Sequence, residues 1–150
     1  LAVLEDTYRR MRAIESELHL ADLPPVEALQ RLVGFTFDHH HSNENFIRLV
    51  MSENMQRGAY LAQSKSIQSL NVPAIAAIAD LYHRGVASGE FRAGLDPVDI
   101  HASISALTFF NVSNRHTFGV IFKQDASAPD AAATRRSCVI DMLLRYLRAP

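Results

Sequence analysis

Several features that quickly assign a chain to a compartment are scarce in this sequence. The 150 residues contain one cysteine, Cys138, so no internal disulfide framework can form, and low cysteine usage is typical of a reducing cytoplasm. No apolar run approaches the ~20 residues that a helix needs to span a bilayer. The chain does not open with a basic segment followed by an apolar one, as secretory signals do. We therefore expect a cytoplasmic protein that has no membrane partner.

An excess of positive charge is also missing. Lysine and arginine number 15 against 16 aspartate and glutamate residues, and the formal net charge is -1. A domain that grips nucleic acid by its phosphates gathers basic residues on one face. We therefore expect that these residues do not themselves bind DNA.

Glycine and proline are few, with six of each, so the elements between them should be long. No segment alternates with period two over a convincing length, and no Asn-Gly or Asp-Gly hairpin signal occurs. With 48% hydrophobic and 21% charged residues, the composition is that of an ordinary globular domain. The sequence predicts one all-α domain, a bundle of six or seven helices.

Apolar spacing and proline positions give the expected boundaries. Residues 55–71 are the hardest to interpret, and we expect a short helix and a loop there; residues 118–128 should be mostly loop. The predicted helices are 1–19, 24–41, 44–54, 71–88, 97–115 and 129–147. In the first of these, one stripe should be buried (Val3, Leu4, Tyr8, Met11, Ile14) and the other side should face water (Arg9, Arg10, Arg12, Glu15).

The first residue, Leu1, is not methionine and has no capping residue before it. The apolar periodicity begins with that residue, as though a helix were already under way. We therefore expect the natural chain to extend upstream.

The segments 97–115 and 129–147 are apolar on most of their sides. A helix of this kind must be covered on most sides. One interpretation is a buried core helix within a single subunit. The other, which we favour, is a four-helix interface between two copies of the chain, formed by Ile104, Phe109, Val139, Met142, Leu143 and Tyr146.

Seven histidines invite a metal or catalytic interpretation. Consecutive His39, His40 and His41 point about 100° apart on a helix, so they cannot all bind one ion. The Glu-x-x-His motif of two-metal bundles is absent, as are the nucleophile elbow and the phosphate-binding glycine loop. We predict no enzyme, no cofactor and no metal site.

The remaining signal is a small-molecule site. Polar groups recur on otherwise apolar helices, and methionines offer adaptable walls. Apolar walls with a few placed polar groups are what such a site needs. The candidate ligand-binding residues are Phe37, His40, Met51, Met55, Tyr82, Leu107, Phe110, Asn111 and Asn114.

Several segments resemble one family. The segment from Leu1 to Tyr8, LAVLEDTY, resembles the helix that follows the helix-turn-helix in tetracycline-repressor-family regulators. The segment from Gly85 to Arg92, GVASGEFR, followed by Leu-Asp-Pro at 95–97, resembles the junction before that family's long eighth helix. Residues 46–55 resemble its sixth-helix region, and the order of elements matches along the chain.

This resemblance implies a bacterial regulator, most often a repressor, that forms homodimers through its last two long helices, here about 97–115 and 129–147. A small effector would bind among the middle helices and shift the spacing of two DNA-reading heads. Those heads precede the helix at Leu1, so we expect DNA contact only through an upstream domain, and residues 1–150 would be the effector-binding and dimerisation domain. The alternative is a helical metal-binding or adaptor bundle unrelated to DNA.

Overall fold

The computed structural model describes all 150 residues, and the chain is all-helical, as predicted. No strand forms; the one β-bridge pairs Phe91 with Arg148. Seven α-helices and two short 3-10 helices follow one another as α1 (Ala2–Ser16), η1 (Leu20–Asp22), α2 (Pro25–Ser42), α3 (Glu44–Met55), η2 (Leu61–Gln63), α4 (Ile67–Ala87), α5 (Pro97–Ser113), α6 (Arg115–Phe122) and α7 (Pro129–Leu147).

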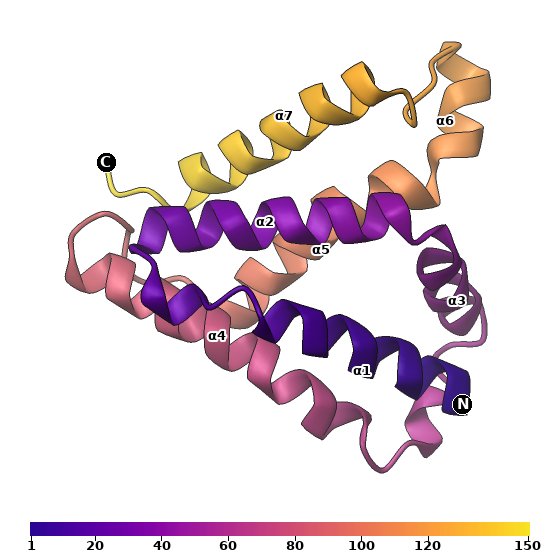
Figure 1. Cartoon of the computed structure of the whole chain (residues 1–150), viewed down its shortest axis with the longest axis horizontal. Coiled ribbons are helices and arrows are strands. Elements are labelled where there is room, and N and C mark those ends of the chain that lie inside the picture. The colour runs from indigo at the N-terminus through magenta and orange to yellow at the C-terminus, as the bar shows by residue number, and fades with distance from the viewer.

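Helix α2 is the central element. It packs against α5, α7 and α4, and α1 packs against α4. Figure 1 shows α7 on one side of α2, α4 and α1 on the other, and α5 behind it. The helices converge near the C-terminus and spread apart toward α6, α3 and the N-terminus. This wedge shape leaves space among α1, α2, α3 and α5 that side chains alone must fill.

The main core lies where the helices converge. Leu29 and Val33 of α2, Leu81 of α4, Ile100 of α5 and Val139 of α7 are almost completely buried in one cluster. A smaller cluster lies at the wide end, where Met11 meets Phe46, Ile47 and Val112. Burial of apolar surface supplies the main folding free energy, at about 25 cal/mol per Å².

Helix starts follow the proline signals. Pro25, Pro97 and Pro129 each occupy the first helical position, where the missing N–H costs nothing and the fixed φ suits a helix. Asp96 caps α5, because its carboxylate accepts a hydrogen bond from the Val98 backbone N–H at 2.9 Å. The predicted starts at 24–25, 97 and 129 are therefore confirmed.

Two boundaries are wrong. Helix α4 begins at Ile67 rather than at 71–73, and Pro73 lies inside it. Its N-cap residue is Ser66, and the Ile67 N–H donates a hydrogen bond to the Ser64 hydroxyl. Residues 115–122 form the separate helix α6 instead of ending one helix and opening a loop.

The chain's C-terminal end is tied to the segment after α4. The Arg92 N–H donates to the Leu147 carbonyl at 2.8 Å, and the Ala149 N–H donates to the Glu90 carbonyl at 3.0 Å. The Arg92 guanidinium also lies over the Tyr146 ring. These contacts hold α7 against the converging end of the bundle.

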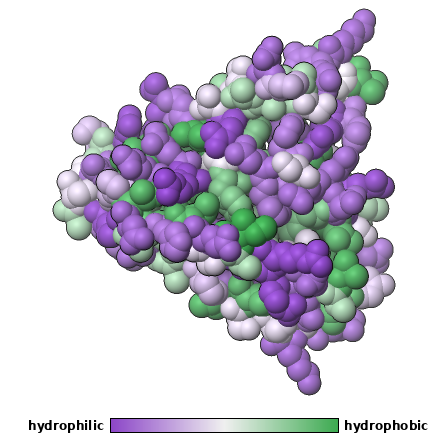
Figure 2. Space-filling view, viewed as in Figure 1, coloured by the Kyte–Doolittle hydropathy of each residue, from purple (hydrophilic) through white to green (hydrophobic).

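The surface is mixed in character. Figure 2 shows broad hydrophilic areas with hydrophobic patches near the centre and over the region of α3 and the start of α1. None of the helices combines the length and the apolarity that crossing a lipid bilayer requires.

Candidate functional site: a cavity between the helices

A cavity of about 200 Å³ lies at the wide end of the bundle. Its lining follows helical periodicity, because residues four apart share one face of a helix. On α2 that face presents Leu32, Thr36 and His40; on α5 it presents His101, Ser105 and Phe109. The other lining residues come from α1, α3 and α4: Tyr8, Met11, Arg12, Glu15, Phe46, Val50 and Ile78, with Ile104 of α5.

Aromatic rings form much of the wall. The Tyr8 ring of α1 and the Phe46 ring of α3 meet edge to face at 5.6 Å between centroids. The His40 ring stacks on Phe46 at 5.6 Å and meets the edge of Phe109 at 6.0 Å. These interlocked rings fix the shape of the cavity, since such pairs prefer specific geometries.

His40 is the most unusual polar residue of the wall. It is only 4% exposed, and its Nδ1 atom is buried without a hydrogen-bond partner. Burial, with the nearby His39 and the positive charge of Arg12, lowers the pKa of His40 to about 4. The imidazole is therefore neutral at pH 7, with one N–H donor and one acceptor nitrogen.

His101, Tyr8 and Thr36 of the wall are also uncharged at pH 7. Burial, then the charge of Arg12, lowers the pKa of His101. Burial is the largest effect on Tyr8 and raises the pKa of its phenol. Thr36 satisfies its own hydroxyl by donating to the Leu32 carbonyl at 2.8 Å. The cavity thus offers neutral hydrogen-bonding groups among rings.

One charged pair completes the wall, and it corrects the sequence prediction for α1. Arg12 and Glu15 were expected to face water, but their side chains are only 12% and 11% exposed and form an ion pair at 2.9 Å. Val3 and Ile14, expected to be buried, are exposed. The reason is that α1 turns a partly polar face toward the cavity and α4, which apolar periodicity does not detect.

The predicted ligand-binding residues fall into separate groups. His40 alone lines the cavity at the wide end. Phe110, Asn111 and Asn114 line a second cavity of about 310 Å³ between α5, α6 and α7, together with Phe118 and Arg135.

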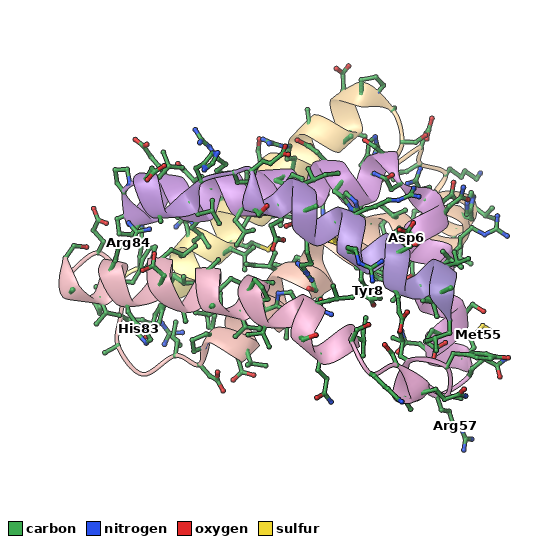
Figure 3. The ribbon with its side chains drawn as sticks, turned by 60° about the horizontal axis from the view of Figure 1, so that its bottom comes forward. Asp6, Tyr8, Met55, Arg57, His83 and Arg84 are labelled. Carbon is green, nitrogen blue, oxygen red and sulfur yellow. The ribbon has the colours of Figure 1, made fainter.

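The remaining predicted ligand-binding residues lie apart from both cavities. Met51 and Met55 are exposed on α3, and Figure 3 shows Met55 at the periphery, beside Arg57. Phe37 is buried and stacks on His41, and Leu107 packs on the main core. The Tyr82 hydroxyl donates to the Arg92 carbonyl and accepts from the Leu95 N–H, so backbone groups already satisfy it.

The predicted interface residues are divided in the same way. Ile104, Val139 and Leu143 are buried in the core of the single subunit, whereas Met142 is exposed. Phe109 lines the cavity at the wide end, and Tyr146 lies beneath Arg92. Apart from Met142, the sides of α5 and α7 that face away from the subunit are therefore formed by other residues.

Sequence reasoning missed most of the cavity lining, although two signals pointed to it. His101 and Ser105 are polar residues one turn apart on an otherwise apolar helix. Arg12 and Glu15 are oppositely charged at a spacing of three, on the same face of the helix as Tyr8 and Met11. Each pattern also occurs on ordinary solvated faces, so neither identifies a cavity without the fold.

The histidines do not gather around a common point. No group of three or more His, Cys, Asp or Glu side chains is placed to hold a metal ion. Two of the aspartates near histidines in the sequence form ion pairs with arginines: Asp38 with Arg136 at 3.0 Å and Asp80 with Arg84 at 3.0 Å. Figure 3 shows His83 and Arg84 toward the far end of α4 from the start of α1.

Comparison with known proteins identifies the fold. Residues 25–143 match the family model of the tetracyclin repressor-like C-terminal domain. The chain belongs to this family. It is also 28% identical over 148 residues to the HTH-type transcriptional repressor NicS of Pseudomonas putida (strain KT2440), a match that covers 99% of this chain and 70% of that protein.

Membership in the tetracyclin repressor-like family confirms the resemblance drawn from the sequence. The chain is a C-terminal domain of a TetR-type transcriptional regulator, the part that binds ligands and dimerises. The match begins at Pro25, the first residue of α2, and ends at Leu143 in α7. It therefore includes α2, α3 and α5, which form most of the cavity wall, but not α1.

Proposed function

We propose that this chain binds a small effector in the cavity at the wide end of the bundle and forms a homodimer through α5, α6 and α7. It thereby controls DNA binding by a helix-turn-helix segment preceding Leu1 in the whole protein. Such a regulator would act in the cytoplasm as a repressor. The extra length of the matched relative, described as a helix-turn-helix repressor, supports the upstream segment.

The observation that carries the effector site is a cavity with unpartnered polar atoms in its wall. Buried polar groups normally have hydrogen-bond partners. His40 has none, and His101 makes no side-chain hydrogen bond within the protein, although both line the cavity. A ligand with polar groups would satisfy them. A volume of about 200 Å³ is below the usual 300–1,000 Å³ of drug-sized sites, which favours a small effector.

Exposed apolar surface on α5 and α6 supports the dimer. Val98, Ala102, Ala106 and Phe110 follow one another at every fourth position on the exposed side of α5, and we call them the α5 stripe. Small side chains allow helices to approach closely. The Phe110 ring contacts Phe118 of α6 edge to face, so the stripe continues onto that helix.

Helix α6 itself exposes an unusual amount of apolar surface. Val120, Ile121 and Phe122 are all exposed, Val120 by 81%. Soluble monomers rarely leave contiguous apolar patches of this kind uncovered. A second copy related by a twofold axis would cover α6 and the α5 stripe together, and such an interface should bury more than ~1,200 Å² in total.

Native mass spectrometry of the protein as purified tests both halves of the proposal, because it reports the dimer mass and any retained small molecule. We expect a dimer at micromolar concentration. Ala106→Glu, which places a charge in the α5 stripe, should give folded monomer, and Ser52→Glu on the exposed side of α3 should remain dimeric. A monomeric parent protein would contradict the dimer.

A further inference from the structure

The ion pair between Arg12 and Glu15 differs from every other ion pair in the chain. The Arg12 Nη1 atom donates to both Glu15 carboxylate oxygens at 3.0 and 2.9 Å, and its Nε atom donates to the Asn71 side-chain oxygen at 3.0 Å. In each of the other ion pairs, at least about a third of both side chains is exposed. Burying two charges costs desolvation free energy that their attraction often fails to recover, so stability does not explain this pair.

The position of the pair suggests another role. Arg12 and Glu15 line the cavity on one side, and on the other they line a surface groove between the end of α1 and α4 that also includes Pro73 and Asp80. The pair is therefore part of the partition between cavity and groove. If the Glu15 carboxylate left Arg12, it could turn into the groove and be hydrated there.

The Arg12 guanidinium also has unused donors. Its Nη2 atom makes no hydrogen bond within the protein and is not fully buried. Guanidinium groups bind carboxylates through two parallel hydrogen bonds, and such charge-assisted bonds are stronger than neutral ones. Arg12 can therefore receive a second acceptor group.

The charge of Arg12 acts on the other polar groups of the wall. Besides burial and, for His40, the neighbouring His39, this charge lowers the pKa of His40 and His101. The neutral imidazoles of His40 and His101 add N–H donors without adding charge. When the Glu15 carboxylate no longer offsets it, the Arg12 charge favours an anion and opposes a cation beside it.

We propose that Arg12 recognises the effector. The cavity takes a small molecule with an anionic oxygen group, and this group binds the Arg12 guanidinium in place of Glu15. The ring-lined wall holds the apolar body of the molecule. This rests on the proposed function of the cavity as an effector site.

The same exchange provides a route from the cavity to α1. Arg12 connects α1 to Asn71 in α4, and Glu5 connects α1 to the serine hydroxyls of Ser64 and Ser66 just before α4. A ligand that changes the hydrogen bonding of Arg12 therefore acts on one of these two contacts of α1. Helix α1 is the element that leads toward the proposed upstream segment, so its position is the property that an effector needs to change.

The test uses three probes of nearly the same size and shape that differ in charge: benzoate (anionic), benzamide (neutral) and benzamidine (cationic). Isothermal titration calorimetry with the full 150-residue chain measures each affinity. We expect benzoate to bind at least about tenfold more tightly than benzamide, as a charge-assisted bond to a buried guanidinium requires, and benzamidine to show no binding.

Variants separate Arg12 from its surroundings. Glu15→Gln removes the competing carboxylate and should tighten benzoate binding by about tenfold while leaving benzamide unchanged. Arg12→Gln should abolish the preference for benzoate. Because this variant leaves the Glu15 charge buried without its partner, the double variant Arg12→Gln/Glu15→Gln provides the same test without an unpaired buried charge. Arg9→Gln, an exposed arginine on the same helix, is the control and should change nothing.

Equal affinity for benzoate and benzamide, or weaker benzoate binding in Glu15→Gln, would overturn the role of Arg12 and leave the effector cavity in place. Absence of binding by all three probes would also overturn it. The effector cavity as such is judged separately, by the small molecule retained in native mass spectrometry.

Discussion

His40 shows how a single side chain links the cavity to the pH dependence of folding. The pKa of His40 is lowered from 6.5 to about 4 in the folded chain. Between these values the unfolded chain binds a proton that the folded chain does not, so folding stability falls as the pH decreases through this range. The lowered pKa values of His39 and His101 act in the same direction.

We therefore expect His40→Gln to flatten the decline in stability between pH 6.5 and 4. Urea titrations measure the free energy of unfolding at each pH. Its decrease per pH unit should be smaller in the variant than in the parent by up to about 1.4 kcal/mol, the contribution of one proton. His83→Gln, at an exposed position of α4, is the control. A decline as steep in His40→Gln as in the parent would show that His40 is not held neutral.

Two buried helical glycines make a matched pair. A Cβ atom at Gly85 would collide with the Phe91 ring, which is buried in the core. A Cβ atom at Gly34 would meet only the guanidinium of Arg136, the end of a flexible side chain on the surface.

Gly85→Ala should lower the free energy of unfolding by about 1–3 kcal/mol, the usual cost of overpacking, despite the helix preference of alanine. Gly34→Ala should change it by less than about 1 kcal/mol, because Arg136 can move aside and alanine favours the helix. Urea unfolding followed by circular dichroism measures both. Equal effects would mean that Phe91 yields as easily as Arg136.

Residue roles were the part that the sequence predicted least well. His40 was identified because a polar residue stood beside Phe37 on an apolar helix. Arg12 and Glu15 were assigned to water because charged residues usually are. The fold places α1 between α3, α4 and the cavity, and only that arrangement makes a charged pair part of the interior.

At the scale of elements, prediction succeeded where strong local signals exist. The proline-marked starts of α5 and α7 are confirmed. The start of α4 was missed because Pro73 suggested a first-turn position, whereas the helix begins at Ile67, whose N–H donates to the Ser64 hydroxyl. Helix α6 was missed because it has only eight residues, too few for a periodic pattern to stand out.

Helix α7 supplies one side of the main core, so its removal should be severe. Deleting residues 129–150 takes Val139, Leu143 and Leu147 away from α2 and α5 and should give an aggregated product, as judged by size-exclusion chromatography. Deleting only residues 148–150 removes the Phe91–Arg148 bridge but leaves these three apolar side chains buried. This shorter truncation should therefore stay soluble. A soluble, folded product from the longer deletion would contradict the role of α7.

At the scale of the whole molecule, all-helical architecture and family followed from the sequence because they depend on the order and length of elements. The proposed dimer depends on surfaces, which apolar patterns describe poorly. Ile104 and Val139 belong to the core of one subunit, whereas Ala102 and Ala106 lie on the outer side of α5. A helix that is apolar on two sides does not reveal from its sequence which side belongs to which neighbour.

If two copies associate through α5, α6 and α7, association should be linked to folding. The midpoint of thermal unfolding should then rise with protein concentration, as mass action requires for a dimer that dissociates on unfolding. In Ala106→Glu the midpoint should not depend on concentration. Differential scanning fluorimetry over a hundredfold range of concentration, about 1–100 μM for a dimer of this class, makes the comparison.

Cys138 is the one thiol of the chain, and it is exposed on α7. A maleimide dye will therefore attach at one known position on each copy, with no need to remove other cysteines first. Spectroscopy on singly labelled protein, from fluorescence anisotropy to pyrene excimer emission between paired copies, can follow this helix in solution without any change to the amino-acid sequence.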